Sequence, residues 1–122
     1  MDYSSVISIL VPDSKFSINQ NDYSTLIWDD SNTTSKPTEE EIINRTNEIL
    51  CEYSYDVLRY ERNKLLESSD KYALLDFPHN SDEKKQEWLT YRQQLRDITT
   101  SQTPSVDSSG NLINIVWPSS PS

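Results

Sequence analysis

Apolar and polar positions follow two different periods along the chain, and the change falls near residue 38. Before it, three short apolar runs are separated by turn-forming residues: "SSVISILV" (4–11), "KFSINQ" (15–20) and "YSTLIWDD" (23–30). Runs of this length, bounded by Pro, Asp and Asn, are typical of β-strands. A sheet of two or three such strands needs another element to cover its apolar face. The sequence therefore predicts a short N-terminal antiparallel β-meander, followed by a polar connector at 31–37.

From residue 38 the apolar spacing becomes helical. Thr38 is suited to cap a helix, and three acidic residues at 39–41 favour its first turn. No Pro or Gly interrupts the chain before Ser68. A helix of about 30 residues is roughly 45 Å long, whereas a compact domain of this chain length is about 35 Å across. We therefore expect a helix that either bends or leaves apolar surface for another chain. Its apolar face consists of Ile42, Ile49, Tyr53, Val57 and Tyr60.

A second helix is predicted at about 82–98, in "DEKKQEWLTYRQQLRDI", with Ser81 or Asp82 as its N-cap. Apolar residues recur in it at spacings of three and four, which is typical of an amphipathic helix. A loop at 68–82 separates it from the long helix, so the two helices are expected to form a helical hairpin. In this hairpin, Leu65 and Leu66 are expected to pack against Trp88 and Leu95.

The last segment, 99–122, is rich in Ser, Thr and Pro and contains the only glycine, Gly110, in a turn-forming "SSGN". "LINIVWP" (112–118) alternates like a short strand. The predicted class is therefore α+β, in three parts. These are an acidic β-rich segment at 1–37, a helical hairpin at 38–98 with helices at about 38–68 and 82–98, and an extended tail at 99–122.

Composition narrows the possible partners. The chain has 20 acidic and 11 basic residues, for a net charge of −9. Binding to nucleic acid or to anionic lipid requires a basic surface, so neither is expected as a partner. No apolar run approaches the roughly 18 residues of a membrane span, and "MDYSSVISILV" lacks the basic start of a secretion signal. Val, Ile, Leu and Phe make up 28 of the 122 residues, so the core is expected to be thin and part of the apolar surface to be covered by a partner.

Candidate catalytic groups are sparse. His79 is the single histidine, and we expect it near solvent in a loop without an orienting partner. Cys51 is the single cysteine, which rules out an intrachain disulfide and favours a reducing compartment; we expect it to be a buried structural thiol. No metal-ligand cluster or phosphate-binding loop is present in the pattern. The sequence therefore predicts no enzyme, no cofactor and no metal site.

Aromatic and arginine residues are the remaining candidates for function. Trp88 and Tyr91 are expected in the core, although Tyr, Trp and Arg are also enriched at protein interfaces. Arg92 and Arg96 lie four residues apart on the second helix. Each is able to pair with an acid or to remain solvated, and we expect one of them to fasten the hairpin. The candidate acids are Asp70, Asp76 and Asp97.

Over about residues 59–121 the sequence resembles the phage tail assembly chaperone family. The resemblance is carried by "ERNKLLESSDKYALLDF", "KKQEWLTYRQQLRDI" and "VWPSSP". The residues that match the family pattern are Arg62, Leu65, Leu66, Asp70, Asp76, Trp88, Tyr91, Arg92, Leu95, Arg96, Asp97, Trp117, Pro118 and Pro121.

This resemblance implies a chaperone without catalytic activity that binds a phage tail-fibre or other tail protein and promotes its folding or trimerisation. It implies action in the host cytoplasm during assembly and leaves retention in the finished tail open. We expect Tyr91, Arg92, Arg96 and Trp117 to contact the partner or to shape the contact surface. The alternative is a structural virion subunit of the tail, baseplate or fibre, attached or homo-oligomerised through the long helix.

Overall fold

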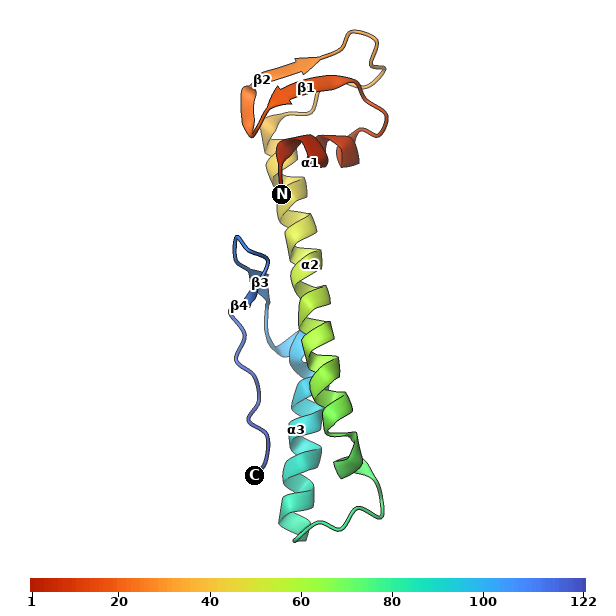
Figure 1. Cartoon of the computed structure of the whole chain (residues 1–122), viewed down its shortest axis with the longest axis vertical. Coiled ribbons are helices and arrows are strands. Elements are labelled where there is room, and N and C mark those ends of the chain that lie inside the picture. Colours follow the sequence, from red (N-terminus) through yellow and green to blue (C-terminus); the bar gives the residue numbers. More distant parts are fainter. The chain divides into compact units, whose positions relative to one another are not determined.

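The computed structural model describes all 122 residues, which form two compact units, Met1–Leu50 (unit 1) and Cys51–Ser122 (unit 2). The fold is α+β, as the sequence predicts, and Figure 1 labels its elements along the chain. The elements are α1 (Tyr3–Leu10), β1 (Phe16–Asn19), β2 (Asp22–Trp28), α2 (Glu39–Ser68), the 3-10 helix η1 (Asp70–Ala73), α3 (Asp82–Ser101), β3 (Ser105–Val106) and β4 (Leu112–Ile113).

The first element of unit 1 corrects the sequence prediction, because residues 3–10 form α1 instead of a strand. Asp2 caps this helix by accepting the Ser5 N–H at 2.8 Å. Val6 and Ile7 are both fully buried. Neighbouring residues of a strand point to opposite faces, whereas in a helix they lie on the same broad face. The helix therefore lets both side chains enter one core.

The two predicted strands at 16–28 are confirmed as an antiparallel hairpin. Phe16 pairs with Trp28, and Ser17 pairs with Ile27. The register shifts between Ser17 and Asn19, which marks a bulge before the turn. Because two strands alone are marginally stable, other elements must cover the hairpin. The residues of this core are Val6, Ile7, Leu26 and Ile42, with Tyr3, Leu10, Phe16, Ile18, Tyr23 and Trp28 packed around them.

The long helix is confirmed as one uninterrupted element of 30 residues. Thr38 Oγ1 accepts the Glu41 N–H at 3.1 Å, as the capping pattern predicts. Glu39, Glu40 and Glu41 occupy the first turn, where carboxylates favour the helix dipole.

The helical hairpin is confirmed within unit 2. Ser81 caps α3 by accepting the Lys84 N–H at 3.1 Å, and the helix ends three residues later than predicted, at Ser101. Figure 1 shows α3 running beside the last turns of α2. The buried residues are Ser54 and Leu58 on α2, Ser69 between α2 and η1, Tyr91, Arg92, Leu95 and Ile98 on α3, and Pro104 beyond α3.

The tail folds back through a two-residue hairpin, with Ser105 opposite Ile113 and Val106 opposite Leu112. The predicted strand at 112–118 is therefore shorter than expected, because its pairing partner β3 has only two residues. Beyond β4 the chain stays extended, and the side-chain amide of Gln102 holds it at Val116.

Candidate partner-binding site

Arg92 connects the two helices of the hairpin. Its Nη1 donates to the carbonyl of Leu66 at 2.7 Å and to Ser69 Oγ at 2.8 Å. Its Nη2 donates to Asp70 Oδ1 at 2.8 Å. The arginine is buried, with 9% of its surface exposed, whereas the Asp70 side chain is 65% exposed. The planar guanidinium thus binds the C-terminal end of α2, where the free carbonyls and the helix dipole favour a cation.

The prediction that one arginine fastens the hairpin is confirmed by this Arg92–Asp70 pair. Arg96 behaves differently, because it is exposed and its hydrogen bonds go only to Gln93 Oε1, at 2.9 and 3.3 Å. Two arginines of one helix, four residues apart, therefore have different roles. The Arg92 guanidinium is buried and hydrogen-bonded within unit 2, whereas the Arg96 guanidinium is exposed to solvent.

An aromatic cluster fills the closed end of the hairpin. Trp88 stacks on Tyr72 with ring centroids 3.7 Å apart, and it meets Tyr91 edge-on at 5.8 Å. Phe77 meets Tyr72 edge-on at 4.9 Å. Trp88 thus joins Tyr72 and Tyr91 in one cluster, and its predicted packing against Leu65 and Leu66 stays a prediction. Sequence reasoning missed the part played by Tyr72 and Phe77, although two aromatics in so short a loop are a usable signal.

His79 belongs to the same cluster. Its Nε2 lies 3.0 Å from the carbonyl of Tyr72, which can only accept, so Nε2 carries the hydrogen. Its Nδ1 is buried without a partner. The ring lies 4.7 Å from that of Phe77. The expected solvent-facing loop histidine is therefore half-buried and serves to hold the loop.

Cys51 corrects another prediction, because its thiol is exposed instead of buried. No hydrogen bond joins Cys51 to His79, and no group of three His, Cys, Asp or Glu residues is placed to hold a metal ion.

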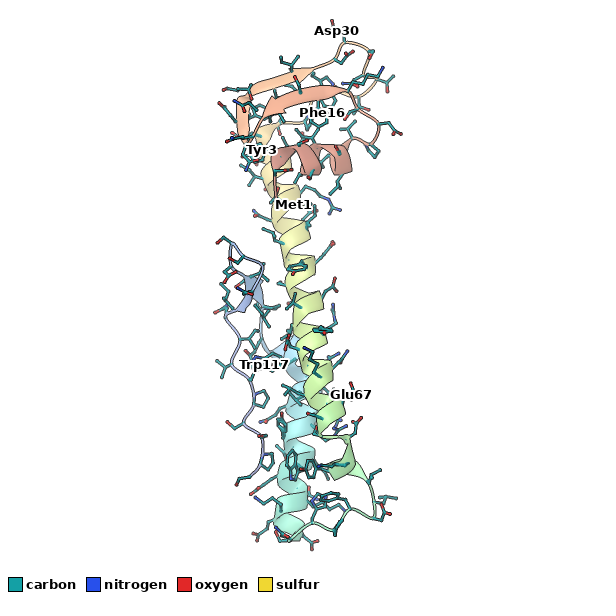
Figure 2. All side chains as sticks on the ribbon, in the orientation of Figure 1. Met1, Tyr3, Phe16, Asp30, Glu67 and Trp117 are labelled. Atoms are coloured by element: carbon teal, nitrogen blue, oxygen red, sulfur yellow. The ribbon has the colours of Figure 1, made fainter.

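Trp117 lies on the extended tail beside α3 (Figure 2), and Pro118 lines the same cavity as Trp117. Both are half-buried. Between the tail and α3 are two cavities of about 770 and 390 Å³ that share Gln94 as a lining residue. Tyr91 lines the larger cavity and Trp117 the smaller one. The structure thus brings two of the four predicted contact residues to one groove, which we call the α3–tail groove.

The other residues of the sequence motif are distributed through unit 2. Leu95 is fully buried, and Leu65 and Leu66 are half-buried at the end of α2. Asp97 is exposed and accepts from Gln93 Nε2 at 3.0 Å, and Arg62 is half-buried and bonds to Asn63. The motif therefore combines core residues with surface residues, and its charged members lie in separate contacts.

One carboxylate of the tail has a perturbed pKa. Hydrogen bonding from the Asn111 amide, with a further bond from Ser109, holds the pKa of Asp107 below its ordinary value of 3.8, although partial desolvation opposes this. Gly110 follows in the same turn with φ +83°, a conformation that favours glycine. The ionised aspartate thus stabilises the β3–β4 turn.

None of the helices is long and apolar enough to cross a membrane. No curated protein and no solved structure matches the chain. A family model described as phage tail assembly chaperone protein matches residues 55–122, more than half of the chain. The matched range contains the segment whose sequence resembles that family, together with the Arg92 contacts, the aromatic cluster and the α3–tail groove. The chain therefore belongs to the phage tail assembly chaperone family.

Proposed function

We propose that this protein binds a phage tail-fibre protein and promotes its folding or trimerisation in the host cytoplasm before the tail is complete. The observation that carries the proposal is the family match over residues 55–122, because members of this family are assembly chaperones for phage tails. The family is not an enzyme class, and its role implies a phage tail protein as the partner. The identity of that partner as a fibre protein is the step that we add.

Exposed apolar side chains in unit 2 support the proposal. Tyr60 is 61% exposed, Leu75 97% and Val116 79%. A fibre chain that has not yet assembled exposes apolar strands and unpaired edges, which are prone to aggregate. A chaperone requires an apolar surface to cover them, and the net charge of −9 favours solubility of the complex.

The four predicted contact residues divide into two roles in this proposal. Arg96 and Trp117 are accessible enough to touch the partner, whereas Tyr91 and Arg92 are buried and hold the surface in shape. Contact residues affect the partner complex without affecting folding. Residues that shape the surface affect both, because the hairpin depends on them.

Co-expression with the tail-fibre protein of the same phage tests the proposal. We expect soluble fibre trimers in the presence of the wild-type protein, a complex in size-exclusion chromatography with light scattering, and aggregated fibre in its absence. Arg96→Ala should weaken the complex while the chaperone keeps its melting temperature. Equal yields of fibre trimer with and without the protein would contradict the proposed function.

A structural virion subunit is the second candidate, and the exposed face of α2 favours it. Ile43 and Leu50 are exposed seven residues apart in unit 1, and Tyr53 and Tyr60 are exposed seven residues apart in unit 2. Heptad spacing of apolar residues suits pairing with another helix, including that of a second copy. Mass spectrometry of purified phage particles separates the candidates, because a subunit is present in a fixed copy number and a released chaperone is absent.

Phage growth tests the absence of catalysis. We expect Cys51→Ala and His79→Gln variants to support normal plaque numbers, because the two side chains share no hydrogen bond and no metal cluster surrounds them. A loss of plaques with a normally folded Cys51→Ala protein would revive an enzymatic role.

A further inference from the structure

We propose that the α3–tail groove binds an extended, lysine- or arginine-bearing segment of the tail protein. This inference rests on the proposed function and specifies where and how the partner is bound. Both cavities of the groove lie within unit 2, and both are lined by α3 and by residues of the tail between Val116 and Pro121.

The dimensions of the groove suit an extended segment. Its lining residues on α3 run from Asp82 to Ser101. Twenty helical residues span about 30 Å, which corresponds to about nine residues of extended chain. The length of the groove thus suits an extended segment.

The charge of the groove is negative. Four carboxylates line it, and no Lys, Arg or His does. Glu87 pairs with Lys84 at 3.0 Å, but the other three have no salt bridge within the chain. Complementary charge at an interface selects partners of opposite sign. The three carboxylates without a salt bridge are Asp82, Glu83 and Asp97, and Asp97 accepts a hydrogen bond from Gln93.

Apolar groups accompany these carboxylates. Tyr91 lies in one cavity, and Trp117 and Pro118 lie in the other. Long basic side chains bury their aliphatic stems against apolar surface and keep the charged end near acids. Lys and Arg therefore match this lining better than short polar or acidic residues do.

The tail wall also offers backbone groups. The C=O groups of residues 117–122 have no hydrogen-bond partner within the chain, and neither do their N–H groups, which Pro118 and Pro121 lack. Val116, in contrast, is bonded on both sides by Gln102, at 2.5 and 2.7 Å. An extended guest is able to pair with such free groups as a strand pairs with a sheet edge. Backbone pairing supplies affinity, and the acids supply the preference for basic side chains.

Fluorescence anisotropy with labelled nonapeptides tests the inference on the full-length protein. The probes alternate Lys with Val, Glu with Val, and Ser with Val. We expect the Lys peptide to bind at least tenfold more tightly than the Glu peptide and to weaken as NaCl is raised. Equal affinities for the Lys and Glu peptides would overturn the inference.

Two variants and a matched control localise the binding. Glu83→Gln/Asp97→Asn removes one carboxylate without a salt bridge from each cavity, and we expect about tenfold weaker binding of the Lys peptide. Gln94→Trp fills the position shared by both cavities and should abolish binding at unchanged charge. The control, Glu52→Gln/Glu67→Gln, removes the same charge from exposed positions of α2 and should bind like the wild type. Equal weakening by control and groove variants would refute a specific groove.

The same variants separate this inference from the proposed function. If the groove variants lose both the Lys peptide and the co-expressed fibre protein, both proposals are supported. If they lose the peptide but still deliver fibre trimers, the groove is not the binding surface for the partner, while the chaperone function stands. If the wild-type protein itself delivers no fibre trimers, the proposed function fails, whatever the peptide result.

Discussion

Replacing Arg92 by Ala removes the only salt bridge between α3 and η1, the 3-10 helix that follows α2. Three hydrogen bonds of 2.7–2.8 Å are lost, and one of them is the salt bridge itself. Because the side chain is 11% exposed, water replaces it poorly. The variant therefore tests whether a buried guanidinium, and not the apolar stripe alone, holds the hairpin together.

The magnitude follows from what remains after the substitution. Ser69 Oγ still donates to the carbonyl of Leu65 at 2.8 Å, and the carbonyl of Leu66 still accepts the Ser69 N–H at 3.2 Å. Neither group is therefore left without a hydrogen bond. A hydrogen bond to a charged group contributes about 1.5–3 kcal/mol. The pair with the exposed Asp70 adds about 1 kcal/mol or less. We expect unit 2 to lose about 3 kcal/mol of its free energy of unfolding.

Tryptophan fluorescence during urea unfolding measures this loss. A Trp28→Phe background removes the tryptophan of unit 1, so that the signal reports on Trp88 and Trp117 in unit 2. Arg92→Lys keeps the charge but not the planar fork, and should lose about half as much. The matched control is Arg96→Ala, for which we expect less than about 0.5 kcal/mol, because its side chain is exposed. Equal destabilisation by Arg92→Ala and Arg96→Ala would refute the reasoning.

Three further predictions concern unit 2. Gly110→Ala should destabilise the tail hairpin by about 1 kcal/mol because φ at this position is +83°; the new Cβ itself would not clash, since it lies 3.5 Å from Tyr53 Oη. Gly110→Asn should destabilise it less, and thermal melting measures both variants. The stabilisation from Asp107 should be complete above pH 3.8 and be lost as pH falls through its lowered pKa, because protonation weakens its hydrogen bond from the Asn111 amide. Amide exchange at Asn111 measures this pH dependence, and Asp107→Asn should flatten it. An unchanged profile in the variant would contradict the prediction. Leu58→Ala should cost about 3 kcal/mol in urea unfolding, because the side chain is fully buried, and a loss below about 1 kcal/mol would contradict its place in the core.

The arginines show where sequence reasoning about the site stops. Sequence spacing placed Arg92 and Arg96 on one helix and suggested that one of them pairs with an acid such as Asp70. Which one does so depends on the rotation of α3 about its axis, and that rotation is set by packing. Leu95 and Ile98 are buried together with Arg92, so Arg96, about 40° beyond Arg92 around the helix, faces out.

Residues 3–10 show a similar limit in the fold. A run of β-branched and apolar residues fits both a strand and a short helix when it is no longer than eight residues. The strand prediction was wrong here, although Asp2 is a local signal for a helix start. The core decides between the two, because only the helix lets Val6 and Ile7 enter the same interior together.

The amino-acid sequence by itself determined the elements whose signals are local. These are the long helix with its Thr38 cap, the second helix with its Ser81 cap, the β1–β2 hairpin, the acidic charge and the family motif. Tertiary structure alone decided which arginine is buried, that Cys51 is exposed, that Trp88 stacks on Tyr72, and that the tail forms a groove with α3. The physical reason is range: caps and periodicity act within one or two turns, whereas burial and grooves depend on side chains brought together from distant parts of the chain.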